Sequence, residues 1–187
     1  MNKTGFWGDA LRDGAILGVV MALSRVLESY LLVDLEFSLD RMSVILFVEM
    51  IAATVAFVWL LHRFTKRRAM AAPMEEGFPY GSGLIYAFTI SVLTGVIVGF
   101  ASYLFIEVVG YQNYVEGYVG RIDQMGAMMP GSEALIDDLV EAVESSPKPS
   151  IFDNILASVN NYIITGTILG LIIARMVRRE PQIFNKE

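Results

Sequence analysis

The apolar stretch from Gly14 to Leu32 constrains this chain most, because it is long enough to cross a bilayer and yet contains charged residues. A transmembrane helix needs about 20 predominantly apolar residues. On a helix of 3.6 residues per turn, Gly14, Gly18 and Arg25 share one face, and Glu28 lies at its margin. A charge inside a membrane is costly unless it faces protein or water. We therefore expect this face to point into a helix bundle.

Three further apolar blocks predict an all-α membrane protein with four transmembrane helices in a bundle. Of the 187 residues, 55% are hydrophobic and 18% are charged, whereas about a quarter of the residues of a soluble domain are charged. The apolar residues also come in long blocks, which is typical of membrane helices. We expect a single membrane domain, residues 1–187, with spans at about 10–33, 42–61, 84–109 and 155–177.

The segment 110–154 is the large part of the chain that we expect outside the membrane. Apolar residues recur at helical spacing in its first half. In its second half Leu135, Ile136 and Leu139 are interspersed with acidic residues, which is typical of an amphipathic helix. We predict a helical insertion of two short helices, which either cover the mouth of the bundle or form a surface for a partner.

The distribution of charge predicts the orientation of the spans. Basic residues in short flanking segments mark the cytoplasmic side of a membrane protein. They precede or enter span one and follow spans two and four, whereas segment 110–154 carries eight acidic and two basic residues. We therefore expect both termini in the cytoplasm and the insertion outside. The basic residues are Lys3, Arg12, Arg63, Lys66, Arg67, Arg68, Arg175, Arg178 and Arg179.

Three of the four spans carry two glycines that are four residues apart. Glycines one helical turn apart let two helix backbones approach closely, which holds membrane helices together. We expect these glycines to pack inside one bundle, and the alternative is that they form contacts between copies of the chain. The pairs are Gly14 with Gly18, Gly95 with Gly99, and Gly166 with Gly170.

Four polar residues are predicted to form a cluster inside the membrane: Arg25, Glu28, Glu49 and Tyr103. Arg25 and Glu49 each lie about eight residues from the outer end of their span, or roughly 12 Å at 1.5 Å per residue. We expect them to pair, with Glu28 as a second partner for Arg25 and Tyr103 at a similar depth. The pair either fixes the register of two helices or lines a proton- or ligand-responsive pocket that opens outward. Near the start of span four, at most one of Asn160 and Asn161 can point inward.

The sequence contains no motif that indicates an enzyme or a cofactor site. The patterns H-E-x-x-H, G-x-S-x-G, Walker A and G-x-G-x-x-G are absent, there is no cysteine, and His62 is the single histidine. No basic surface of the kind that binds nucleic acid is present. The expected partners are the lipid bilayer and either another membrane protein or a second copy of the chain. The basic run after span two either reflects topology alone or binds anionic lipid.

These observations favour a non-enzymatic membrane protein that acts as a scaffold or modulatory subunit. The alternative is a small oligomeric transporter or ion-conducting protein that uses the Arg and Glu cluster. Segment 6–18, the charge-bearing second span, the Tyr111–Tyr114 segment of the acidic insertion and the basic end of the last span together carry a resemblance. The chain resembles a bacterial family of small four-span membrane proteins, a domain of unknown function. That resemblance implies the topology and a location in the bacterial inner membrane, and it implies no catalytic residues.

Overall fold

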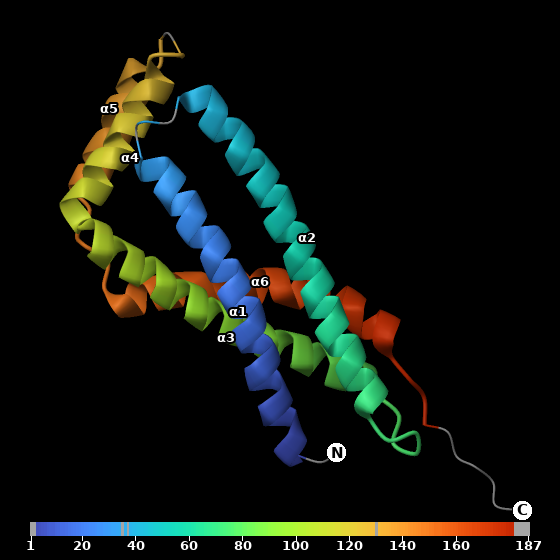
Figure 1. The fold of residues 1–187 in the computed structure, drawn as a ribbon. Coiled ribbons are helices and arrows are strands. Elements are labelled where there is room, and N and C mark those ends of the chain that lie inside the picture. The colour runs from blue at the N-terminus through green and yellow to red at the C-terminus, as the bar shows by residue number, and fades with distance from the viewer. Residues whose placement is uncertain (1–2, 35, 37, 130, 182–187) are drawn as a thin grey trace, which may run out of the picture.

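The computed structural model describes residues 3–34, 36, 38–129 and 131–181, and six helices make up most of them (Figure 1). The predicted all-α class is confirmed: the described ranges contain no strand, only an isolated bridge between Phe78 and Arg179. α1, α2, α3 and α6 are long and apolar enough to cross a membrane. The helices are α1 (Lys3–Val33), α2 (Leu39–Ala71), α3 (Tyr80–Val109), α4 (Tyr111–Gly126), α5 (Glu133–Glu144) and α6 (Ile151–Val177).

Each predicted span lies within one of these helices, but the helices are longer than the predicted spans. We expected span two to end near Leu61, whereas α2 continues to Ala71. The reason is packing, because Phe64, Thr65 and Ala69 lie beyond the predicted end and are buried against the rest of the bundle. Burial of these side chains stabilises the helix beyond the point at which the sequence becomes more polar.

α3 is the central helix, and it packs on α1 on one side and on α6 on the other (Figure 1). Glycines permit both contacts. On α1, Gly14 and Gly18 lie against the side chains of Leu93 and Ile97 of α3. The α3 glycines face the α6 backbone, and the α6 glycines face small residues of α3. These α3–α6 pairs are Gly95 with Val159, Gly99 with Ile155, Gly166 with Ser91, and Gly170 with Ala87.

α2 packs well against the bundle along only part of its length. We call the end of the bundle that holds the start of α1, the 72–79 loop and the end of α6 the termini end; the opposite end, which holds α4 and α5, is the hairpin end (Figure 1). Five of the buried residues of α2 lie between Phe57 and Ala69, toward the termini end. No α2 residue between Met42 and Phe57 is buried. The half of α2 nearer the hairpin end therefore packs loosely.

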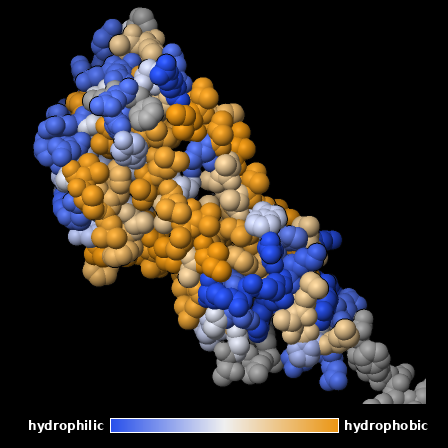
Figure 2. Space-filling view, viewed as in Figure 1, coloured by the Kyte–Doolittle hydropathy of each residue, from blue (hydrophilic) through white to orange (hydrophobic). Residues whose placement is uncertain are grey.

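The surface is divided as expected for a membrane protein. Figure 2 shows a hydrophobic belt around the middle of the molecule and hydrophilic residues gathered at both ends. Large apolar side chains of α2 and α6 are exposed, among them Phe47, Val55 and Ile168. In a bilayer these side chains would contact lipid, so their exposure follows from the solvent in which such a protein folds.

Arg121 of α4 fastens the α4–α5 hairpin to the end of α1. Its buried guanidinium donates hydrogen bonds to the carbonyl oxygens of Leu31 and Leu32, at 3.2 Å each, and to that of Asp34. The last carbonyls of a helix have no partner within the helix, so Arg121 supplies one. Gly117 lies directly against Val33, which brings the α4 backbone close to the same helix end.

Replacing Arg121 with alanine is expected to release the hairpin from α1. Losing these charge-assisted hydrogen bonds lowers the free energy of opening by about 1.5–3 kcal/mol. Hydrogen exchange of the α4 amides measures this opening directly. Gln124→Ala is the control, because Gln124 accepts a hydrogen bond from the same guanidinium at 2.8 Å within α4, and its loss leaves the bonds from Arg121 to residues 31–34 in place. Equal α4 protection in the parent and Arg121→Ala proteins would show that Arg121 does not fasten the hairpin.

Candidate functional site

A polar cavity lies between α1, α2 and α6, in the half of the bundle nearer the hairpin end. Its volume is about 480 Å³. It opens beside the loosely packed half of α2, and Figure 2 shows a hollow with hydrophilic surface inside the hydrophobic belt. The lining residues are Met21, Ser24, Arg25, Glu28, Leu46, Glu49, Met50, Ala53, Thr54, Val98, Ala157, Ser158, Asn161 and Tyr162.

The three charged residues of the cavity do not pair as we expected. Arg25 donates through Nη1 to Glu28 Oε2 at 2.7 Å, one turn along the same helix. Glu49 accepts a hydrogen bond from Ser24 and has no ion pair among the described residues. The predicted Arg25–Glu49 ion pair is therefore wrong, although both residues line one cavity. α2 comes close enough at this level for Ser24 of α1 to reach Glu49, but the Arg25 side chain turns along its own helix to Glu28, because residues three apart on a helix are neighbours.

Tyr103 lies outside this cavity. It forms a hydrogen bond with Glu107 of α3, which in turn pairs with Lys148 at 2.7 Å. The aromatic residue of the cavity is instead Tyr162 of α6, whose ring centroid lies 5.4 Å from that of Phe57. Of the two asparagines near the start of span four, Asn161 lines the cavity. The depth of Tyr103 was predictable, but the face of α3 that carries it was not.

Two tyrosines of α4 lie close to the Arg25–Glu28 pair from the hairpin end. The rings of Tyr114 and Tyr118 are 5.2 Å apart, and both hydroxyls interact electrostatically with Arg25. Burial raises the pKa of the Tyr114 hydroxyl to about 12, and the nearby positive charge of Arg25 opposes that rise. Tyr114 is therefore neutral at physiological pH. The α4–α5 hairpin thus places two aromatic side chains beside the Arg25–Glu28 ion pair.

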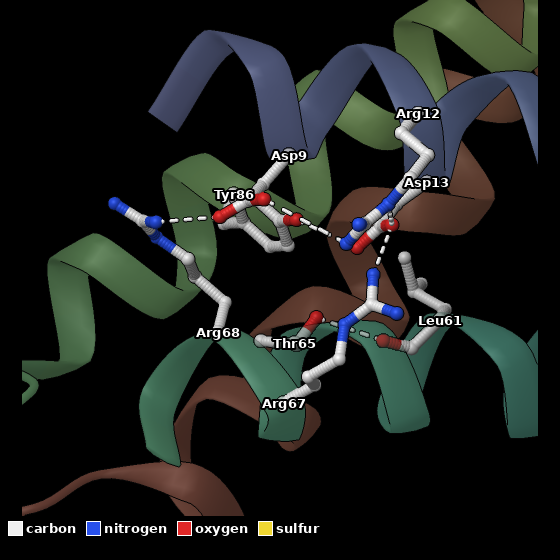
Figure 3. Close-up of polar contacts among 8 residues, drawn as sticks. All are labelled: Asp9, Arg12, Asp13, Leu61, Thr65, Arg67, Arg68 and Tyr86. Carbon is white, nitrogen blue, oxygen red and sulfur yellow. Dashed lines mark hydrogen bonds and ion pairs between the residues drawn. The ribbon is translucent and has the colours of Figure 1, made fainter. Parts of the chain in front are cut away.

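A second group of charged residues, which the sequence analysis did not identify as a site, joins three helices at the termini end (Figure 3). Asp13 of α1 is fully buried. Its carboxylate accepts hydrogen bonds from Tyr86 Oη of α3 at 2.7 Å, from Arg67 of α2, and from Arg12 Nε at 3.3 Å. We call Asp13 and these three partners the Asp13 network.

An adjacent pair extends this contact between α1 and α2. Asp9, one turn before Asp13, pairs with Arg68, the neighbour of Arg67, at 2.7 Å (Figure 3). Two acids one turn apart on α1 therefore meet two consecutive arginines on α2. That pattern was present in the sequence, but the arginines were interpreted there as topology signals or as a site for anionic lipid, not as partners of the α1 acids. Because the Asp13 carboxylate is fully hydrogen-bonded, this network is suited to holding helices together rather than to binding a ligand.

The remaining chemistry at these sites is limited to charge and hydrogen bonding. Within the described ranges, no group of three or more His, Cys, Asp or Glu side chains could hold a metal ion. The site residue that stands out is Glu49, a carboxylate that lines the cavity and has no cationic partner among the residues that the structure describes. This arrangement can bind a positive charge.

Comparison with known proteins identifies a family but no activity. No curated protein and no solved structure matches the chain. A family model described as "Protein of unknown function (DUF4199)" matches residues 12–179, which include all four long apolar helices apart from the first residues of α1. The chain therefore belongs to the DUF4199 family of proteins of unknown function.

Proposed function

We propose that this protein is a non-enzymatic, multi-pass protein of the bacterial inner membrane that binds a small, positively charged solute in the polar cavity. Both termini would lie in the cytoplasm, as the basic residues of the termini end favour, and the α4–α5 hairpin would lie outside. The observation that carries the proposal is the position of Glu49. It is a carboxylate in a cavity between apolar helices, without a cationic partner among the residues the structure describes.

The balance of charge favours a cation as the ligand. Arg25 and Glu28 neutralise each other, so Glu49 leaves the cavity with one negative charge when it is ionised. A carboxylate at membrane depth is costly unless a proton or a cation neutralises it. Tyr162 adds an aromatic ring, and Asn161 adds an amide that can orient a polar ligand. The volume of about 480 Å³ lies within the usual range for small-molecule sites.

The packing of α2 supports access to the cavity from the hairpin end. No α2 residue between Met42 and Phe57 is buried, so this half of the helix can move with little loss of buried area. Toward the termini end the bundle is closed, because Leu17 and Leu61 are fully buried and the Asp13 network lies beyond them. A solute would therefore enter from outside, and release to the other side would require α2 to move.

Replacing Glu49 with glutamine is expected to weaken cation binding by about 10- to 100-fold, because a hydrogen bond to a charged group contributes about 1.5–3 kcal/mol. The probes are choline and tetramethylammonium, titrated calorimetrically into the full chain in detergent. Glu107→Gln is the matched control: it removes a carboxylate from the same half of the molecule, where Lys148 pairs with it outside the cavity. Failure of the parent protein to bind either probe would overturn the proposal.

A role as a scaffold or modulatory subunit is the second candidate, and the exposed apolar face of α2 supports it. Phe47, Val48 and Ile51 are large, exposed and on the part of α2 that packs least. Such a face can contact a transmembrane helix of a partner as well as lipid. If the parent protein binds neither ammonium probe and purifies from native membranes with one stoichiometric protein, this function replaces the first.

A further inference from the structure

We propose that a groove at the termini end binds the phosphate of an anionic membrane phospholipid. The groove lies where the start of α3 meets the end of α6, and the residues that line it are Tyr80, Leu171, Arg175, Arg178 and Glu180. It lies at the opposite end of the bundle from the hairpin. The inference does not depend on the proposed function, since none of these residues lines the polar cavity.

Arg175 is the residue that most needs explaining in this groove. It is exposed and forms no hydrogen bond or ion pair with any residue that the structure describes. Neighbouring arginines at this end are already engaged. Arg67 and Arg68 pair with acids of α1, and Arg179 donates to the carbonyl oxygen of Ala72 at 2.8 Å. Arg175 is thus a cation that is free to bind an anion.

Arg178 can contribute a second positive charge to the same ligand. Leu171 and Arg175 are four residues apart and share one face of α6, and Arg178, the first residue after the helix, lines the same groove. The partner of Arg178 is Glu180, at 2.8 Å, and the side chains are 56% and 80% exposed. An ion pair exposed to this degree contributes little stability. A phosphate can therefore compete with Glu180 for the guanidinium.

The surface beside the arginines favours a lipid over a soluble phosphate. Ile164, Ile168 and Leu171 precede Arg175 at alternating spacings of four and three residues, so they form a stripe on the same face of α6. All three side chains are exposed. An acyl chain can lie along this stripe while its phosphate contacts Arg175 and Arg178. Tyr80 at the edge of the groove is the kind of aromatic residue that favours the membrane interface.

The test is a titration of the purified full chain in detergent with phosphatidylglycerol, followed by native mass spectrometry. Arg175→Gln is expected to weaken binding about fivefold, and adding Arg178→Gln is expected to weaken it about fivefold again, as about 1 kcal/mol per basic residue at an anionic surface implies. Arg63→Gln is the control, because Arg63 lies at the same end but stacks over Trp59 at 5.0 Å. This control should bind the lipid as the parent does.

Two further arms identify the ligand and keep the test independent of folding. In the parent protein, phosphatidylcholine should bind more weakly than phosphatidylglycerol, a comparison that needs no variant. Inorganic phosphate at millimolar concentration should not displace phosphatidylglycerol. Displacement by inorganic phosphate would make the groove a site for a soluble anion and overturn the lipid proposal. Equal binding of the two lipids, or equal affinity in the parent and the double variant, would overturn it as well.

Discussion

Replacing Arg67 with alanine is expected to destabilise the protein by about 3 kcal/mol, at the lower end of the range for breaking a buried ion pair. The change leaves the fully buried Asp13 carboxylate without its main cationic partner (Figure 3). Tyr86 and Arg12 would still donate to Asp13, which is why the lower end of the range applies. Equilibrium unfolding in mixed micelles, with rising dodecyl sulfate, measures the loss.

Arg68→Ala is the matched control for this prediction. Arg68 is the next residue along α2 and also pairs with an acid of α1, but its partner Asp9 is partly exposed. Asp9 is 35% exposed and can be solvated without Arg68, unlike the fully buried Asp13, so losing this pair should cost about 1 kcal/mol. Adding Asp13→Asn to Arg67→Ala should recover part of the loss, because it removes the buried charge that lacks a partner. If Arg67→Ala and Arg68→Ala are equally stable, the Asp13 network does not hold the termini end together.

The lengths of the apolar stretches were enough to predict the four long helices, because a bilayer demands about 20 apolar residues from each span. The ends of the helices were not predictable in this way. α2 continues past Leu61 because Phe64 and Ala69 find buried positions against other helices. Tertiary packing decides whether such buried positions exist, and the hydropathy of a single segment does not predict them.

For the candidate site, the depth of the polar residues was predictable from the sequence, but their orientation was not. Counting residues from the span ends places Arg25 and Glu49 at one depth, and the structure brings both into the polar cavity. Depth does not specify rotation about a helix axis, so Tyr103 was assigned to the cluster while Tyr162 was missed. It also does not specify which way each side chain points: Glu49 accepts a hydrogen bond from Ser24 of α1, whereas Arg25 turns along its own helix to Glu28.

Asp13 shows where the sequence argument missed a structural residue. Near the start of span one, we used only the basic residues, as topology signals, and assigned no role to Asp13. Asp9 and Asp13 on one face of α1, and Arg67 and Arg68 at the matching end of α2, were the available signal. To predict the contact between these acids and arginines, one would have to know that α1 and α2 are antiparallel neighbours and that α2 continues beyond its apolar stretch. The structure shows both.

Replacing Gly99 with alanine is expected to destabilise the protein by about 3 kcal/mol, at the upper end of the usual range for overpacking. An added Cβ would lie 2.5 Å from Ile155 Cα and 2.6 Å from the carbonyl oxygen of Asn154. Both atoms belong to the α6 backbone, so no side-chain rotation relieves the clash and the two helices must separate. The unfolding measurement used for Arg67→Ala checks this prediction.

Two glycines provide graded controls for this expectation. An added Cβ at Gly8 meets nothing within 4 Å, so Gly8→Ala should be neutral or stabilise by up to about 1 kcal/mol through helix propensity. An added Cβ at Gly170 lies 3.2 Å from the Ala87 Cβ, so Gly170→Ala should fall between the two. A Gly99→Ala protein as stable as Gly8→Ala would show that α3 and α6 do not approach this closely.

Gly99→Ala also connects helix packing with the proposed cation site. Ile155 lies one turn before Ser158 on α6, and Ser158 and Asn161 form one wall of the polar cavity. Val98, the neighbour of Gly99, lines the same cavity from α3. Moving the start of α6 away from α3 displaces that wall while leaving Glu49 on α2 unchanged. We therefore expect Gly99→Ala to weaken choline binding, and Gly8→Ala, at the far end of α1, to leave it unchanged.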